Sequence, residues 1–264
     1  MDSTTGMNVM MYYIVYVFAM AGLKGNNLLV SSSIQYVINV CLTVPALLYV
    51  DRWGRRNTLL LGALGMMTFM FTNAGLLASY GHYAGPKGIN NVPEASWALS
   101  GPPAKALIAC TYLFVACFAP SWGPVSWIYP PELYPLRVRG KAVALSTSAN
   151  WIFNFALTYF VPPAFVNIQW QVYIIFGVFN LAAFIHVFFA FPETAGKTLE
   201  EVEDMFTDPN GIKGIGTPAW KTRKAYGKAR ALETGRVAHD GGEKAQALHR
   251  EGSTSGSDLE KPKV

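Results

Sequence analysis

Uncharged polar side chains recur at helical spacing within apolar stretches of this sequence, and their amide and hydroxyl groups suit a ligand rich in hydroxyl groups. Three such sets are spaced four residues apart: Asn8 with Tyr12, Gln35 with Asn39, and Asn150 with Asn154 and Thr158. Residues at this spacing share one face of a helix. A buried amide is costly without hydrogen-bond partners, so we expect the three faces to surround one polar cavity. Hydrogen bonding between helices is the alternative explanation for any single amide.

A second group combines tryptophan with helix-breaking residues. Two pairs bracket the short segment around Trp127, namely Gly123-Pro124 and Pro130-Pro131. Proline lacks the N–H donor that a helix needs, so we expect a kinked or interrupted helix here. The ring of Trp127 or Trp122 can stack on an apolar ring face, such as the C–H face of a sugar. Packing or anchoring at a membrane interface is the alternative.

Charged side chains gather in two short polar connections. The first connection contains Asp51, Arg52, Arg55 and Arg56, and the second contains Glu132, Arg137, Arg139 and Lys141. Carboxylates and guanidinium groups from adjacent connections can form bidentate pairs. Such pairs must break when the parts that they join move apart. We therefore expect an ion-pair network at one end of the molecule.

Residues that could catalyse a reaction form no recognisable set in the sequence. His186 has no carboxylate, cysteine or second histidine in its own apolar segment, which favours packing over a metal site or proton relay. Cys41, Cys110 and Cys117 also lie in apolar segments, where we expect them to pack as free thiols. No glycine-rich loop for phosphates is present. The sequence thus predicts no enzyme, no cofactor or metal, and no nucleic-acid partner.

The polar residues must be positioned by apolar segments, of which the sequence holds six. They fall near 7–23, 28–50, 58–80, 105–129, 142–164 and 171–191. Most have about the ~20 residues that cross a ~30 Å hydrocarbon core as a helix. Hydrophobic residues make up 52% of the chain. We therefore expect residues 1–191 to form an all-α domain of six transmembrane helices in a lipid bilayer.

The C-terminal residues differ sharply from this domain. Residues 192–264 hold 12 of the 21 Lys and Arg and 12 of the 16 Asp and Glu. We expect a short amphipathic helix within 192–207 and a disordered tail over 208–264. With the two charged connections, the tail carries 18 of the 21 basic residues. The positive-inside rule places that side in the cytosol, which predicts a cytosolic C-terminus and an outward-facing loop at 81–104.

Five motifs give the chain a resemblance to a known family. In order they are Gly6-Met7-Asn8 with Tyr12-Tyr13, Asp51-Arg52-Trp53-Gly54-Arg55-Arg56, Gly123-Pro124 to Trp127 followed by Pro131-Glu132-Leu133-Tyr134-Pro135 with Arg137 and Arg139, Asn150-Trp151 with Asn154, and Pro192-Glu193-Thr194 followed by Gly196-Lys197-Thr198-Leu199-Glu200-Glu201. Their order and spacing resemble the sugar porter family of the major facilitator superfamily. The resemblance covers residues 6–207 and matches the C-terminal six-helix half of that fold, with the long loop at 81–104 similar to fungal hexose carriers.

The resemblance implies roles for particular residues. Sugar-contacting or cavity-lining positions correspond to Asn8, Asn39, Trp127, Asn150 and Asn154, to which the helical faces above add Tyr12 and Gln35. The cytoplasmic charge network that locks the outward-facing state corresponds to Asp51, Arg55, Glu132 and Arg139, with Arg56 beside it. It also implies transport of a neutral monosaccharide across the plasma membrane by alternating access. Proton coupling stays open.

Two departures qualify the resemblance. Asp2 and Ser3 stand where the family has a pair of glutamines, and a counterpart of the N-terminal half is absent from this sequence. A porter site lies between two six-helix halves, so we expect a fragment of a longer carrier or a half-carrier that needs a partner chain. A sugar receptor that signals through its tail and an inert membrane fragment are the alternatives.

Overall fold

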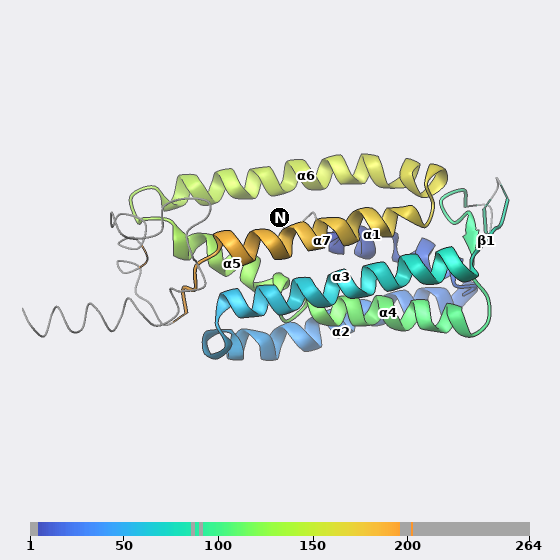
Figure 1. Cartoon of the computed structure of the whole chain (residues 1–264), viewed down its shortest axis with the longest axis horizontal. Helices are drawn as coiled ribbons and strands as arrows, with labels where there is room; N and C mark the ends of the chain where they lie inside the picture. Colours follow the sequence, from blue (N-terminus) through green and yellow to red (C-terminus); the bar gives the residue numbers. More distant parts are fainter. Residues whose placement is uncertain (1–4, 86–87, 90–91, 196–201, 203–264) are drawn as a thin grey trace, which may run out of the picture. The chain divides into compact units, whose positions relative to one another are not determined.

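The computed structural model describes residues 5–85, 88–89, 92–195 and 202, which all belong to one compact unit, Met1–Trp220. Within them the helices are α1 (Met7–Met20), α2 (Gly25–Trp53), α3 (Arg55–Tyr80), α4 (Pro102–Phe118), α5 (Trp122–Leu133), α6 (Arg139–Asn167) and α7 (Gln171–Ala190), and the strands are β1 (His82–Tyr83) and β2 (Trp97–Ala98). The helices run along a common direction (Figure 1). The predicted tail at 208–264, and most of 192–207, lie outside the described residues.

Four stretches of these helices are long and apolar enough to cross a membrane. They are Gly25–Val50, Arg55–Tyr80, Pro102–Leu133 and Gln171–Ala190. Helix α1 has only 14 residues, and α6 has 29 but carries polar residues along its length, Asn150 and Asn154 among them. The helical membrane fold is therefore confirmed, while the count of six spans stays a prediction.

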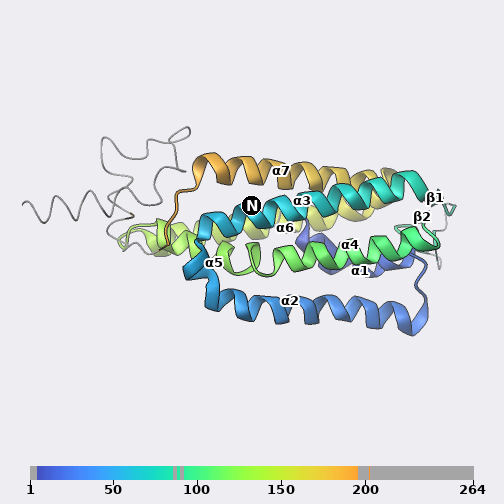
Figure 2. The same ribbon diagram turned by 60° about the horizontal axis from the view of Figure 1, so that its bottom comes forward.

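Helix α3 lies at the centre of the bundle, packed mainly against α7 and α4. Small residues allow this close approach. A β-carbon at Gly65 of α3 would lie 2.6 Å from the Cys117 sulfur of α4, and one at Gly177 of α7 would lie 2.8 Å from the Phe71 ring of α3. In both views α2 lies at the edge of the bundle, beside α4 and away from α7 (Figures 1 and 2).

The predicted helix interruption is present, but it lies slightly earlier than the sequence suggested. Helix α4 ends at Phe118 and α5 begins at Trp122, so the break precedes Gly123-Pro124, and Pro130-Pro131 lies inside α5. Pro120 cannot donate the backbone hydrogen bond that would continue the helix. The Ser121 hydroxyl donates to the Cys117 carbonyl at 2.5 Å and the Ser121 N–H donates to the Phe118 carbonyl at 3.0 Å, which satisfies part of the exposed helix end.

Described residues of the loop at 81–104 contact the helix ends. Strands β1 and β2 pair antiparallel. The Trp97 indole donates to the Leu77 carbonyl at 2.8 Å, and the Leu99 N–H donates to the Met20 carbonyl at 2.8 Å. These two bonds attach the loop to the ends of α3 and α1.

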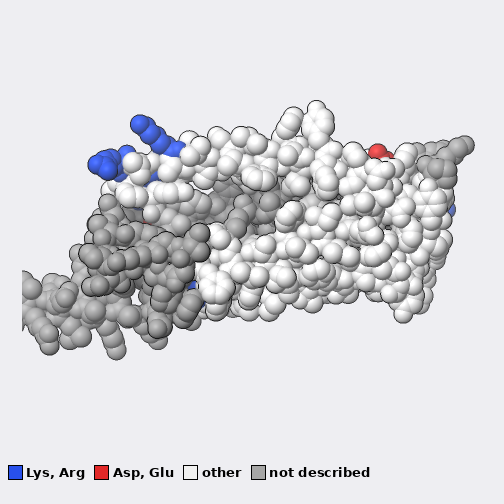
Figure 3. Space-filling model, turned by 45° about the horizontal axis from the view of Figure 1, so that its top comes forward, with Lys and Arg blue, Asp and Glu red and all other residues white. Residues whose placement is uncertain are grey.

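Apolar surface dominates the sides of the helix bundle. Helices α2 and α6 are the most exposed, with Leu48 74% exposed on α2 and Leu145 and Tyr159 73% and 70% exposed on α6. The face in Figure 3 is almost free of charge between its two ends, and most of its Lys and Arg atoms lie at the left end, with a small blue area at the right edge. A surface of this kind suits a hydrocarbon environment or a second helical partner.

Candidate functional site

Residues from two of the predicted polar faces meet between α1 and α6. The Asn8 amide donates to the Asn154 side-chain oxygen at 3.1 Å, and the Asn154 amide donates to the Tyr12 hydroxyl at 3.3 Å. Asn154 is 8% exposed, whereas Tyr12 is 55% exposed. The cluster therefore has a buried anchor in α6 and an accessible rim in α1. We call Asn8, Tyr12 and Asn154 the amide cluster.

A neighbouring tyrosine extends the same seam between the two helices. The Tyr13 hydroxyl donates to the Thr158 carbonyl at 3.2 Å, and the Tyr13 ring lies 6.4 Å from the Phe165 ring. The Thr158 hydroxyl donates to the Asn154 carbonyl at 2.9 Å, which is a bond within α6 and not a bond to the side chains of the cluster. Tyr13 was part of a motif in the sequence, but its residue type alone gave no sign that it would join α1 to α6.

Trp127 and Asn150 line a separate hollow between α5 and α6. Its volume is about 320 Å³, and its walls include Ser126, Tyr129, Tyr134, Ser146 and Thr147. Hydroxyl groups and aromatic rings in one cavity can hydrogen-bond and stack a polar ring. Trp127 is 55% exposed, so its ring face is open in this chain. The arrangement is compatible with the predicted role of both residues.

The polar pair on α2 joins neither group of contacts. Gln35 is fully buried, and neither its side-chain oxygen nor its nitrogen has a hydrogen-bond partner within the described part of the chain. Asn39 accepts a hydrogen bond from Thr43 at 3.2 Å. Neither residue lines the hollow beside Trp127. A role for Gln35 and Asn39 in binding a ligand stays a prediction.

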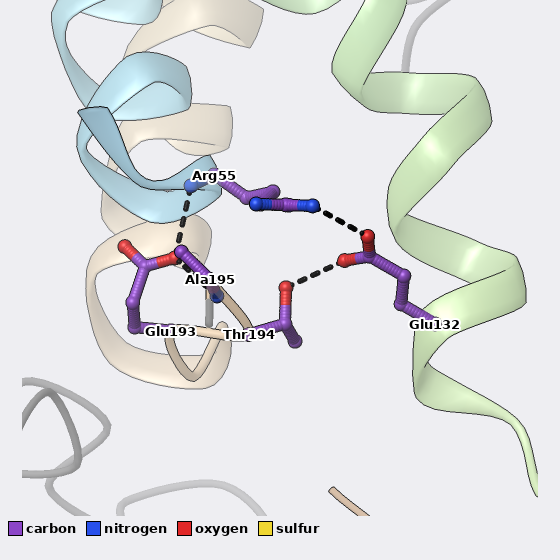
Figure 4. Close-up of polar contacts among 5 residues, drawn as sticks. All are labelled: Arg55, Glu132, Glu193, Thr194 and Ala195. Carbon is purple, nitrogen blue, oxygen red and sulfur yellow. Dashed lines mark hydrogen bonds and ion pairs between the residues drawn. The ribbon is translucent and has the colours of Figure 1, made fainter. Parts of the chain in front are cut away.

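Glu193 forms the centre of the charged end of the molecule. Its carboxylate accepts the backbone N–H of Arg55 at 2.9 Å (Figure 4). It also accepts the backbone N–H of Arg56 at 3.3 Å, in the same first turn of α3. This end of a helix carries free N–H groups and a positive dipole. Glu193 is 4% exposed, so it caps α3 as a buried carboxylate. The sequence showed Glu193 only as the end of the last span.

Gly54 makes room for this cap. Its φ is +87°, and a β-carbon there would lie 2.5 Å from a Glu193 carboxylate oxygen. A larger residue would therefore suffer both backbone strain and a direct clash. The glycine in the first charged motif is explained by the approach of a carboxylate 139 residues later in the chain.

A second carboxylate connects α3, α5 and the segment after α7. The Arg55 guanidinium pairs with Glu132 at 2.9 Å, and the Thr194 hydroxyl donates to the other Glu132 oxygen at 2.7 Å (Figure 4). The Arg55 and Glu132 side chains are 10% and 23% exposed, so the pair is largely shielded from water. We call Gly54, Arg55, Glu132, Glu193 and Thr194 the charge latch.

The remaining predicted network residues lie in different places. The Arg56 guanidinium donates to the Phe188 carbonyl at 2.9 Å and lies over the Phe188 ring at 5.3 Å, which ties α3 to α7. Arg139 donates to the Tyr134 carbonyl at 3.2 Å, within its own connection. The side chain of Asp51 lies outside the described residues. Of the five predicted residues, Arg55 and Glu132 form an ion pair with each other.

Known proteins that resemble this chain include sugar transporters. The model of the family described as "Sugar (and other) transporter" matches residues 1–206. The high-affinity glucose transporter of Kluyveromyces lactis is 51% identical over 220 residues, which cover 82% of this chain and 38% of that protein. The MFS glucose transporter mfs1 of Aspergillus flavus is 45% identical over 246 residues, which cover 92% and 44%. The chain spans about two fifths of the length of these relatives.

Solved structures agree with the relatives. A crystal structure of a double-tryptophan XylE mutant matches with a TM-score of 0.64 and 31% identity, over 76% of this chain and 40% of that one. The crystal structure of a D-xylose-proton symporter matches with a TM-score of 0.59 and 29% identity, over 75% and 42%. Family, relatives and fold together show that this chain belongs to the sugar transporter family, whose members are membrane transporters and not enzymes.

Proposed function

We propose that the chain is the C-terminal half of a carrier that moves a neutral monosaccharide by alternating access. The observation that carries this proposal is the separation of charge from the amide cluster. Within the described part of the chain, Asn8, Tyr12 and Asn154 bond to one another through neutral groups, whereas the ion pair of Arg55 with Glu132 lies at the start of α3 and the end of α5. A neutral wall suits a sugar, which offers hydroxyl groups and no charge.

The names of the relatives support this substrate class. Two of them are called glucose transporters, and a structural neighbour is called a D-xylose-proton symporter. These names favour transport over the receptor hypothesis, and they fit a hexose or a pentose equally well. The symporter makes proton coupling a reasonable hypothesis for the complete carrier.

In this mechanism the charge latch holds the cytosolic ends of α3, α5 and α7 together in one conformation. Its bonds are charge-assisted and shielded from water, and such bonds are stronger than neutral ones. Opening the cytosolic side would separate Arg55 from Glu132 and Glu193 from the start of α3. The sugar shifts the equilibrium only by binding one conformation better than the other.

We further propose that α1 and α6 complete a set of six spans in the plasma membrane. The loops at 81–104 and 168–170 would then face outward, and Gly54, residues 134–138 and the C-terminus would face the cytosol. Arg52, Arg55, Arg56, Arg137, Arg139 and Lys141 all lie near the proposed cytosolic side. Labelling by an impermeant maleimide in intact cells tests this topology. Ser100→Cys should react and Leu136→Cys should not, and the reverse pattern would refute the orientation.

The exposed faces of α2 and α6 are the proposed contact surfaces for the other half of the carrier. Their apolar side chains, such as Leu48 and Leu145, cover little of their own bundle. The other half is either part of a longer polypeptide or a partner chain. Either arrangement would enclose the rim of the amide cluster and the open ring of Trp127.

The decisive experiment measures sugar uptake in a yeast host that lacks hexose carriers. Residues 1–264 alone should give no saturable uptake, since one wall of the site is absent. Fusion to the N-terminal half of the Kluyveromyces lactis relative, with glutamine at positions 2 and 3, should give uptake that glucose or xylose saturates. Saturable uptake by the isolated chain would show that it works as a half-carrier, and a well-expressed fusion without uptake would refute the proposal.

A further inference from the structure

One buried amide lies apart from both the amide cluster and the charge latch. Asn180 is at the centre of α7, the most apolar of the candidate spans, and is 0% exposed. Its side-chain nitrogen lies 2.8 Å from the Phe176 carbonyl and 2.8 Å from the Thr5 carbonyl. The first bond stays within α7. The second bond reaches 175 residues back along the chain, to Thr5, which lies two residues before the start of α1.

The segment that Asn180 contacts is a sharp turn and not a regular helix. Gly6 has φ +87° and ψ 2°, which is the left-handed conformation, and α1 begins at the next residue. A β-carbon at Gly6 would lie 3.0 Å from the Met70 side chain and 3.1 Å from the Phe176 ring. The turn is therefore packed between α3 and α7, and the amide of Asn180 donates a hydrogen bond to its Thr5 carbonyl.

This turn sets the direction in which α1 presents its polar face. The first helical bond of α1 runs from the Met10 N–H to the Gly6 carbonyl at 2.9 Å. Asn8 lies two residues after Gly6, and Tyr12 lies one helical turn after Asn8. A rotation of the turn would carry both side chains away from Asn154, because residues on one helical face move together.

We propose that Asn180 is a positioning residue that aims the amide cluster. By holding the Thr5 carbonyl against α7, it sets the rotation of α1 that brings Asn8 and Tyr12 to Asn154. The effect of Asn180 on sugar binding rests on the proposed transport function. The effect of Asn180 on the position of α1 does not, because the distance between α1 and α6 is measurable without transport.

The first test measures that geometry in membranes that contain the 264-residue chain. Cysteines are placed at Asn8 and Asn154, with Cys41, Cys110 and Cys117 replaced by alanine, and the rate of disulfide formation with copper phenanthroline is measured. Asn180→Leu should slow the reaction at least about five-fold. Asn73→Leu is the matched control, since Asn73 is also 0% exposed but bonds to Thr111 on α4. It should leave the rate unchanged.

A second variant guards against failure of Asn180→Leu to fold. Gly6→Ala leaves Asn180 intact but strains the same turn, and it should slow the reaction similarly. Equal rates in the parent chain and in either folded variant would overturn the proposal. Equal slowing by Asn73→Leu would also overturn it, because any lost buried amide would then have the same effect.

The second test uses the fused carrier and separates positioning from general stability. Asn180→Leu should raise the sugar concentration for half-maximal uptake by about two-fold to ten-fold, the loss expected for one hydrogen bond. The maximal uptake rate per carrier in the membrane should not change. A fall in maximal rate alone would overturn the positioning role. Slowed cross-linking in a fusion without uptake would support the positioning of α1 while refuting the transport function.

Discussion

The charge latch and the amide cluster use hydrogen bonds of different strength at different depths in the bundle. In the latch, bonds of 2.7 to 2.9 Å connect Arg55, Glu132 and Thr194, and a 4% exposed carboxylate caps α3. In the cluster, neutral bonds of 3.1 and 3.3 Å end at a tyrosine that is 55% exposed. Strong shielded bonds suit a contact that holds a conformation. Weak accessible bonds can be exchanged for those of a sugar.

The latch also imposes steric limits that the cluster lacks. Glu193 approaches Gly54 so closely that no side chain fits between them. Around Tyr12 the surface is open. Substitutions in the latch should therefore change stability and conformation, whereas those in the cluster should change affinity. The predictions below test this division, beginning with the largest effect.

Gly54→Ala should have the largest effect. The new β-carbon would lie 2.5 Å from the Glu193 carboxylate at a φ of +87°. We expect a loss of roughly 2–4 kcal/mol of stability from strain and displacement of the cap. Thermal unfolding of the fused carrier in detergent measures this loss. Gly101→Ala is the control, because Gly101 precedes α4 with φ +75° and has no atom within 4 Å of the added carbon. Equal losses would remove the steric argument.

Glu132→Gln should have the second largest effect. It removes the carboxylate charge that pairs with the Arg55 guanidinium, in a site where the two side chains are 10% and 23% exposed. We expect about 1–3 kcal/mol in favour of conformations open to the cytosol. The reactivity of a cysteine at Ser146, in the hollow beside Trp127, reports the shift in a background without other cysteines. Glu94→Gln in the outer loop is the control. Unchanged reactivity would argue against a gating role.

Asn154→Ala should act on affinity. It removes both hydrogen bonds of the amide cluster, and we expect about 1–2 kcal/mol, or a five-fold to thirty-fold rise in the sugar concentration for half-maximal uptake. Melting temperature should change less than for Gly54→Ala. Asn167→Ala is the control, since that exposed amide of the same helix bonds only to the Pro163 carbonyl among the described contacts. A large stability loss without an affinity change would reverse the comparison.

Tyr13→Phe should have the smallest effect. It removes one exposed bond of 3.2 Å to the Thr158 carbonyl but keeps the aromatic contacts with Tyr16 and Phe165. We expect about 0.5 kcal/mol in thermal unfolding. Tyr16→Phe, which keeps the same ring stack, serves as the control. A loss as large as that of Glu132→Gln would show that the seam between α1 and α6 holds the conformation as firmly as the latch.

The sequence predicted local features well because helical spacing and charge are local properties. The spacing of Asn8 and Tyr12 correctly indicated one face of a helix, and the pairing of Arg55 with Glu132 was anticipated from the two charged connections. The number of membrane spans was harder to predict. Helix α6, with 29 residues, is long enough to cross a membrane, but it mixes polar with apolar residues and is not among the four candidate spans. Glu193 was missed because nothing in a Pro-Glu-Thr motif shows which helix its carboxylate will cap.

By itself, the sequence determined a helical membrane protein with neutral polar residues on its helix faces and charged residues in its short connections, and its motifs resembled the family that the comparisons showed. Those properties follow from residue type and short-range spacing. Only the tertiary structure decided that Glu193 caps α3 across Gly54, that Asn8 and Tyr12 meet Asn154 while Gln35 does not, and that Asn180 bonds to the Thr5 carbonyl. The physical reason is that each contact joins residues from separate helices, and its geometry depends on how those helices pack and rotate.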